Sequence, residues 1–136
     1  AQAIDADGWL HTGDVGMIGP DGTLGIQARI PAVVIVGGFN AYPAEIGHVL
    51  LTHPAIAEAA IIAIPDERMG EVCAACVVLR EGAELTLPDL ASWSRERLAN
   101  FKVPRRLFIR DSFPKTPLGK VQKFLLKQQV MEEVPQ

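Results

Sequence analysis

The sequence predicts an α+β domain, built as a small sheet of about three strands flanked by helices and preceded by a β-hairpin. Three observations lead to this fold class. Short apolar segments rich in β-branched residues, typical of strands, alternate with segments whose apolar residues recur at helical spacing. Proline and glycine separate these segments. The 136 residues are 49% hydrophobic and 21% charged, which are ordinary values for a folded globular domain.

The hairpin is expected within residues 9–29. Its turn is Gly19-Pro20-Asp21-Gly22, which has a turn-forming composition and separates two apolar arms. The composition then changes at residues 29–31. This change indicates a boundary between two parts of the chain, residues 1–29 and residues 30–136.

The remaining elements are expected in the order strand, helix, strand, strand, helix, strand and helix. Pro43 stands at the start of the first helix, where its missing N–H costs nothing, and Thr86 is the expected N-cap of the second. Gly37 and Gly38 interrupt the chain between the first strand and the first helix. Strands are expected at residues 30–36, 56–64, 72–79 and 106–110, and the last helix at residues 120–131, after a loop at residues 113–119.

Charge and cysteine usage exclude several functions. The formal charge of −3 argues against a nucleic-acid or anionic-lipid partner. No apolar run approaches the ~18 residues of a transmembrane helix. Cys73 and Cys76 have the spacing of a redox or zinc motif, but they fall inside an expected strand and lack a second ligand pair. We therefore interpret both cysteines as residues of the hydrophobic core. We also expect the protein to reside in a reducing compartment, the cytoplasm.

Five segments in order resemble the adenylate-forming enzymes, the family of acyl-CoA synthetases, luciferase-like ligases and peptide-synthetase adenylation domains. Together they span nearly the whole chain. Asp66, Gly70 and Glu71, in the third segment, are interpreted as loop-forming residues. The segments are GWLHTGD (8–14), AR with VIVGGFNAYPAEI (28–29 and 34–46), PDERMGE (65–71), LANFKVP (98–104) and PKTPLGK (114–120).

The resemblance implies that residues 1–29 are the tail of a larger N-terminal domain and that residues 30–136 form the C-terminal lid domain. The family activates a carboxylic acid with ATP to acyl-AMP and transfers the acyl group to CoA. Mg²⁺ would be bound mainly by ATP and the N-terminal domain, which is the partner of the lid. The phosphate loop and acyl pocket are absent from this sequence, which begins with Ala1, so we expect a fragment of a longer protein that is inactive alone.

The same resemblance implies roles for six residues. Lys120 would be the catalytic lysine that bridges the substrate carboxylate and the α-phosphate, because an ammonium on a flexible stem suits that charge. Asp14, assisted by Arg29, would bind the AMP ribose, whose hydroxyls a carboxylate accepts. Gly37, Gly38 and Phe39 would line the pantetheine tunnel. The structural alternatives are a solvated lysine, a turn-forming aspartate, a surface arginine and a simple glycine turn. Lys102, Arg105 and Arg106 could meet CoA phosphates, although a solvated basic face is the simpler interpretation.

One departure from the family pattern concerns the hinge of the lid. Pro31-Ala32 stand where the family usually has Lys-Asp, or a second Lys, and proline removes torsional freedom there. An acyl-CoA synthetase, for fatty or aryl acids, remains the main hypothesis. The alternatives are the lid of a peptide-synthetase adenylation domain and a non-catalytic interaction module that retains the fold.

Overall fold

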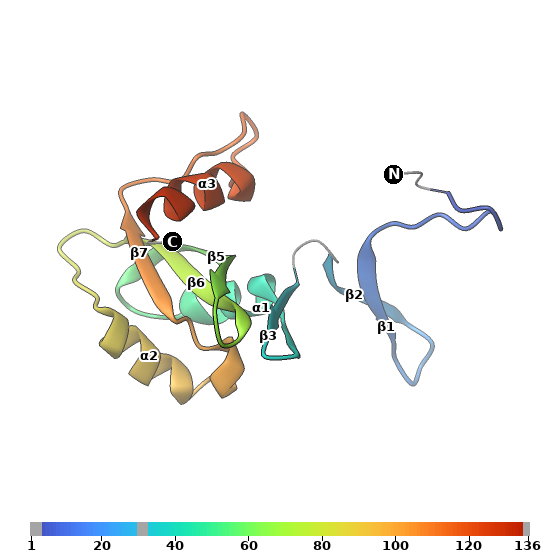
Figure 1. The fold of residues 1–136 in the computed structure, drawn as a ribbon, viewed down its shortest axis with the longest axis horizontal. Coiled ribbons are helices and arrows are strands. Elements are labelled where there is room, and N and C mark those ends of the chain that lie inside the picture. The colour runs from blue at the N-terminus through green and yellow to red at the C-terminus, as the bar shows by residue number, and fades with distance from the viewer. Residues whose placement is uncertain (1–3, 30–32, 135–136) are drawn as a thin grey trace. The chain divides into compact units, whose positions relative to one another are not determined.

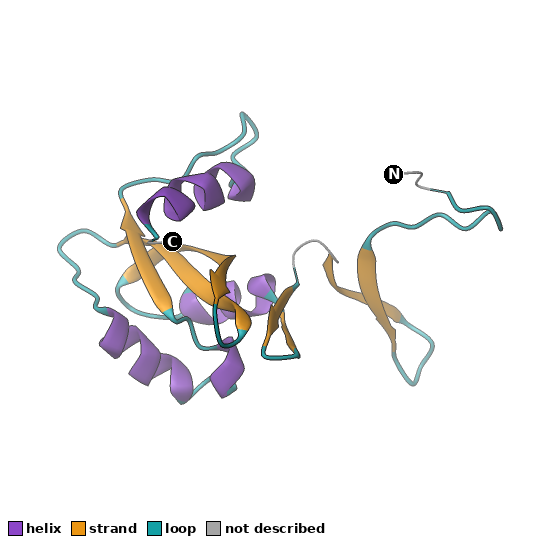
Figure 2. Cartoon of the chain, in the orientation of Figure 1, coloured by secondary structure: helices purple, strands orange, loops and turns teal. Residues whose placement is uncertain are grey.

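The chain divides into two compact units, Ala1–Val33 and Val34–Gln136. A computed structural model describes residues 4–29 and 33–134 (Figure 1). Pro31 and Ala32, at the proposed hinge, lie outside the described residues. The α+β class is confirmed, with strands and helices distributed as Figure 2 shows.

The first unit contains the expected hairpin. Strands β1 (Asp14–Ile18) and β2 (Leu24–Arg29) pair in antiparallel fashion. The Gly19 amide donates to the Thr23 carbonyl at 2.8 Å, which closes the turn between them. Asp14 lies opposite Arg29 in the register, so the two residues proposed to bind ribose stand on adjacent strands.

The second unit is built on a five-stranded sheet. The long strands β5 (Ile56–Asp66) and β6 (Gly70–Leu79) form an antiparallel hairpin, and β7 (Arg106–Arg110) runs parallel to β6 on its other edge. Two short strands, β3 (Val34–Val36) and β4 (Phe39–Ala41), extend the sheet beside the start of β6. Strands β3, β5, β6 and β7 lie where the sequence predicts strands, whereas β4 is not predicted because a strand of three residues has too short a pattern to be identified.

Helices and a short turn cover this sheet. Helix α1 (Pro43–Leu50) and helix α3 (Lys123–Glu133) both pack against β5. Helix α2 (Leu87–Arg95) begins as expected at Thr86, whose hydroxyl oxygen accepts from the Asp89 amide at 3.3 Å. A 3₁₀ turn, η2 (Asn100–Lys102), leads into β7. Within the described ranges no helix has the length and apolar character required to cross a bilayer.

The core lies on both sides of the two long strands. Ile61 and Ile62 are successive residues of β5 that point to opposite faces, and both are buried. Cys73 and Cys76 in β6 are fully buried and unpaired, and burial raises the pKa of each thiol to about 11. Both cysteines therefore act as small core residues, as the sequence indicates.

A ring cluster joins the end of α1 to α2. The His53 ring meets the Trp93 ring edge-on at 4.8 Å, and the Arg97 guanidinium lies 4.1 Å from the Trp93 centroid. The Ala55 amide donates to His53 Nδ1 at 3.1 Å. Burial, and secondarily the charge of Arg97, lower the His53 pKa from its ordinary 6.5. The folded state therefore favours neutral histidine.

This cluster predicts a pH dependence of stability. His53 binds fewer protons in the folded chain than in the unfolded chain. Neutral His53 therefore makes its full contribution to the free energy of unfolding above about pH 6.5, and this contribution is lost as the pH falls toward and through the lowered pKa. Urea unfolding between pH 7.5 and 5 should show a falling free energy of unfolding, and His53→Asn should flatten that slope. The carboxyls of Asp5, Asp21 and Asp66, whose pKa values lie below 3.8, act at lower pH. Equal slopes in the variant and the native chain would contradict this assignment.

Candidate functional site

Lys120 lies on the outgoing arm of a tight hairpin. The Thr116 amide donates to the Lys120 carbonyl at 2.8 Å, and the Lys120 amide donates to Thr116 Oγ1 at 3.2 Å. Between them, Gly119 adopts a positive φ of 84°, which a side chain would strain. Lys115 and Val121 form the bridge at the base of this hairpin, which we call the Lys120 hairpin (residues 115–121).

The Lys120 hairpin corrects the expected start of the last helix. Helix α3 begins at Lys123, three residues after Lys120, because the Thr116–Lys120 hydrogen bonds hold that segment in a turn. Lys120 is exposed, and within residues 4–29 and 33–134 its ammonium has no ion-pair partner. Burial, and secondarily the charge of Lys120, lower the pKa of Lys123. The exposed ammonium of Lys120 is therefore accessible to an anionic ligand.

Gly37 and Gly38 form the two-residue turn between β3 and β4. Their φ values of 56° and 90° belong to a type I′ hairpin turn, which requires positive φ at both positions. The sequence predicts this glycine turn between a strand and a helix. In the structure it lies between two strands, β3 and β4. Phe39 follows the turn, is 59% exposed and stacks on Phe101 with ring centroids 5.1 Å apart.

The two glycines face different surroundings. The Gly37 amide donates to the Met69 carbonyl at 2.9 Å, and a Cβ on Gly37 would lie 2.5 Å from Met69 Cε. A Cβ on Gly38 would meet no atom within 4 Å. The absence of a side chain at Gly37 therefore lets the turn pack closely against Met69, whereas Gly38 leaves open space beside the exposed Phe39.

Asp66 and Gly70 shape the neighbouring turn between β5 and β6. Asp66 Oδ1 accepts from the amides of Arg68 and Met69, each at 2.9 Å. The hydrogen bond from the Met69 amide, and next the one from the Arg68 amide, hold the pKa of the Asp66 carboxyl below its usual value. Gly70 supplies a positive φ of 80°. The loop-forming interpretation of the PDERMGE segment agrees with this geometry.

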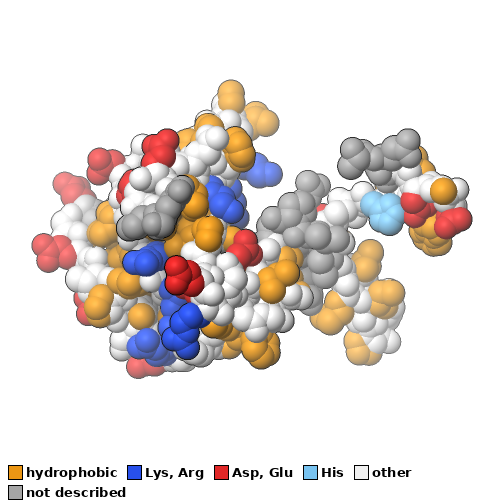
Figure 3. All heavy atoms as spheres, viewed as in Figure 1, with side chains coloured by type: hydrophobic (Ala, Val, Ile, Leu, Met, Phe, Trp, Pro, Cys, Tyr) orange, Lys and Arg blue, Asp and Glu red, His pale blue; other side chains and the backbone are white. Residues whose placement is uncertain are grey.

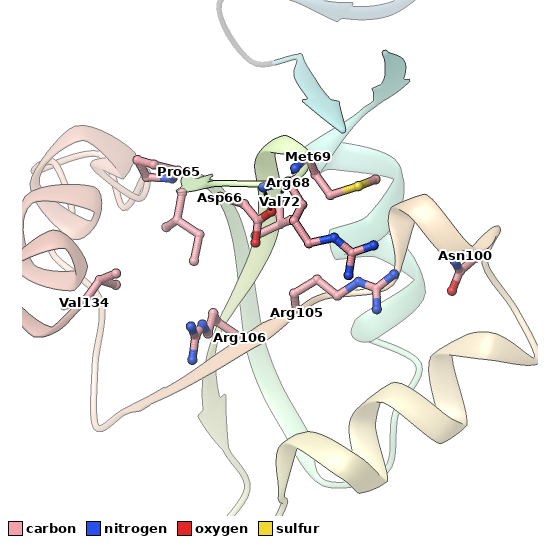
Figure 4. A pocket seen from close by; sticks show the side chains of 10 residues that line it. Pro65, Asp66, Arg68, Met69, Val72, Asn100, Arg105, Arg106 and Val134 are labelled. Atoms are coloured by element: carbon pink, nitrogen blue, oxygen red, sulfur yellow. Dashed lines mark hydrogen bonds between the residues drawn. The ribbon is translucent and has the colours of Figure 1, made fainter. Parts of the chain in front are cut away.

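A cleft of ≈ 420 Å³ adjoins this turn (Figure 4). It carries three guanidinium groups, from Arg68, Arg105 and Arg106, around the single carboxylate of Asp66. The side chains of Arg68 and Arg105 extend in the same direction in Figure 4. On the face of this unit that Figure 3 shows, Lys and Arg side chains are exposed together with acidic ones. Sequence reasoning missed Arg68, which joins the other two only through the fold.

Lys102 differs from these arginines because it is already paired. Its ammonium donates to both carboxylate oxygens of Glu45, at 2.9 and 3.1 Å. This ion pair ties η2, which carries Phe101, to α1. Lys102 therefore supports the stacked aromatic pair and is not a free cation on the basic face.

Asp14 and Arg29 belong to the first unit. The Asp14 amide donates to Thr12 Oγ1 at 3.2 Å, and Gly13 before it has a positive φ of 76°. The side chain of Arg29 lies outside the described part of the structure, and the backbone register places Arg29 opposite Asp14. Among the described residues, no group of three or more His, Cys, Asp or Glu side chains is arranged to hold a metal ion.

Comparison with known proteins decides the family. The family model of the AMP-binding enzyme C-terminal domain matches residues 45–120, more than half of the chain. The chain belongs to this family. The match ends at Lys120 and includes both the Asp66 turn and the cleft arginines.

Relatives of this C-terminal domain include CoA ligases. The chain is 50% identical over 129 residues to the 3-[(3aS,4S,7aS)-7a-methyl-1,5-dioxo-octahydro-1H-inden-4-yl]propanoyl:CoA ligase of Rhodococcus jostii, covering 95% of the chain and 25% of that enzyme. It is 40% identical over 126 residues to an oxalate–CoA ligase of Arabidopsis thaliana, covering 93% and 24%. The chain thus spans about a quarter of the length of the relatives it matches.

Solved structures show the same fold. ATP-bound MatB from Rhodopseudomonas palustris superposes with a TM-score of 0.83 at 35% identity, over 93% of the chain and 25% of that protein. The o-succinylbenzoate CoA synthetase MenE of Bacillus subtilis, in complex with an acyl-adenylate, gives 0.81 at 38% identity, over 92% and 25%.

Proposed function

We propose that this domain is the C-terminal lid of an AMP-forming acyl-CoA ligase, which joins a carboxylic acid to CoA at the expense of ATP. The observation that carries the proposal is the exposed Lys120 ammonium, which lies at the end of a hydrogen-bonded hairpin and has no ion-pair partner among the described residues. The CoA ligases among the relatives support it. In this proposal residues 1–29 end a larger N-terminal domain, and the lid follows from residue 30.

Lys120 serves the first half of the proposed reaction. The substrate carboxylate attacks the α-phosphorus of ATP, the new C–O–P linkage forms, and pyrophosphate leaves. Negative charge gathers on the α-phosphate oxygens and the incoming carboxylate during this step. A cation held close to both stabilises the transition state more than the separated reactants. Lys120 supplies that charge without forming a bond.

Asp14 and Arg29 serve the nucleotide. The Asp14 carboxylate accepts hydrogen bonds from the ribose hydroxyls, and Arg29 assists from the paired strand. Binding of this kind holds the AMP moiety in both half-reactions. Mg²⁺ would be bound mainly by ATP and the N-terminal domain, and no step of this proposal depends on the described residues binding it.

The second half-reaction uses the Gly37-Gly38 turn. The CoA thiolate attacks the acyl carbon and AMP leaves. Gly37, Gly38 and Phe39 line the channel for the pantetheine arm, for which the space beside Gly38 and the exposed Phe39 ring are suited. The guanidinium groups of the cleft offer charge to the phosphates of CoA. Two unpaired buried thiols suit a reducing compartment such as the cytoplasm.

The proposal predicts that the 136-residue chain is inactive by itself and that the longer enzyme which carries it is active. The 136-residue chain, mixed with ATP, Mg²⁺ and carboxylic acids, should release no pyrophosphate above background. The longer enzyme that carries it should release pyrophosphate with its acid and form acyl-CoA when CoA is added. Pyrophosphate release and acyl-CoA are measured by coupled assay and mass spectrometry. Turnover by the chain alone, or a longer protein that forms no acyl-AMP, would overturn the proposal.

A further inference from the structure

Glu58 lies on β5, outside the five segments that resemble the family, and it contacts the Lys120 hairpin. Its Oε1 accepts a hydrogen bond from Lys115 Nζ at 2.6 Å. The two residues are 57 positions apart in the sequence, so only the fold brings them together. Charge-assisted bonds of this length are the stronger ones in proteins.

Lys115 transmits this contact to Lys120. Lys115 pairs with Val121 at the base of the hairpin, and the next residue, Thr116, makes two hydrogen bonds with the backbone of Lys120. The Gln122 amide donates to the Pro114 carbonyl at 2.8 Å and closes the base. Fixing Lys115 on β5 therefore fixes the arm from which Lys120 extends.

The chain around Glu58 is shaped for this contact. The register between β5 and β6 shifts between Ile56 and Glu58, which marks a β-bulge. Bulges re-aim side chains and are frequent beside functional sites. Helix α3, which follows the hairpin, also packs against β5 (Figure 1).

The ion pair has a second effect, on charge. Lys115 and Lys120 stand on opposite arms of one hairpin, and both carry an ammonium. The carboxylate of Glu58 engages Lys115, whereas Lys120 has no such partner among the described residues. Only one of the two ammonium groups is thus presented to an anionic ligand.

We propose that Glu58 is a positioning residue, which acts through Lys115 to hold the hairpin that presents Lys120. This inference rests on the proposed adenylation role of Lys120. Both partners are 39% exposed, and exposed ion pairs contribute little to stability. Loss of Glu58 should therefore affect the rate of adenylation much more than it affects folding.

The test uses three variants of the longer enzyme. Glu58→Ala should lower kcat for acyl-AMP formation about 10-fold, since small misplacement of a catalytic group is costly, with the KM for ATP and the melting temperature little changed. Glu133→Ala is the matched control, because it breaks an ion pair of the same 2.6 Å length, with Arg110, away from the hairpin. Glu58→Lys combined with Lys115→Glu restores the pair with reversed charges and should recover most of the rate.

The outcomes separate this inference from the proposed function. If Lys120→Ala leaves adenylation unchanged, the proposed function itself fails. If Lys120→Ala is defective but Glu58→Ala is as fast as the Glu133→Ala control, only the positioning role is wrong. The positioning role is also wrong if the variant with reversed charges does not recover the rate of adenylation. It is equally wrong if Glu58→Ala slows adenylation only in proportion to a lowered melting temperature. In the Lys120→Ala background, Glu58→Ala should cause no further loss.

Discussion

Replacing Lys120 by alanine in the longer enzyme is expected to slow acyl-AMP formation by about 10²–10³, the usual scale for losing one preorganised charge contact. Transfer of the acyl group from preformed acyl-AMP to CoA should be nearly unchanged. The reason is a further part of the proposal: we infer that the lid rotates between the two half-reactions and carries Lys120 away from the reacting atoms. Pyrophosphate exchange measures the first step, and rapid mixing of acyl-AMP with CoA measures the second.

A control for this variant comes from the same region. Lys127 is exposed on α3, and Lys127→Ala removes one positive charge without altering the hairpin. It should leave both half-reactions within about twofold of the native rate, since surface substitutions of this kind are generally near neutral. Equal losses in both halves for Lys120→Ala, together with a lowered melting temperature, would mean that Lys120 supports the fold and does not act in adenylation.

Local sequence patterns were sufficient for the long elements. Thr86 caps α2 because its hydroxyl oxygen accepts a hydrogen bond from the Asp89 amide, which has no partner within the first turn of the helix, and this signal is local. Strand β7 was predicted with its observed bounds of Arg106–Arg110, because a short apolar run between charged residues is a local pattern. The buried cysteines followed from the strand that contains them.

What the sequence did not predict depends on contacts across the fold. The start of α3 was placed too early because Lys120 has good helix propensity, whereas its backbone is held by Thr116. The β3–β4 turn depends on the Met69 carbonyl, 32 positions after Gly37. Arg68 enters the basic cleft, and Glu58 reaches Lys115, through tertiary packing alone. Patterns within a short segment of sequence cannot predict contacts between residues that are far apart in the chain.

The thiol half-reaction should be selectively sensitive to bulk at Gly38. Gly38→Leu places a side chain in the open space beside Phe39, where the pantetheine arm is proposed to pass. Acyl transfer from preformed acyl-AMP is expected to slow by about 10²-fold, because the thiol no longer reaches the acyl carbon in a productive position. Acyl-AMP formation should stay within about twofold, since Lys120 lies on a separate hairpin. Rapid-mixing assays of both steps measure the difference.

The leucine also strains the backbone, because Gly38 has a φ of 90°. Gly82→Leu is the matched control: Gly82 has a φ of 74°, equally open surroundings and a place in the turn between β6 and α2. Both variants should lose similar stability in urea unfolding, but Gly82→Leu should keep the native rate of acyl transfer. Similar slowing in both variants would assign the defect to strain, and the glycine turn would then have no part in the path of the thiol.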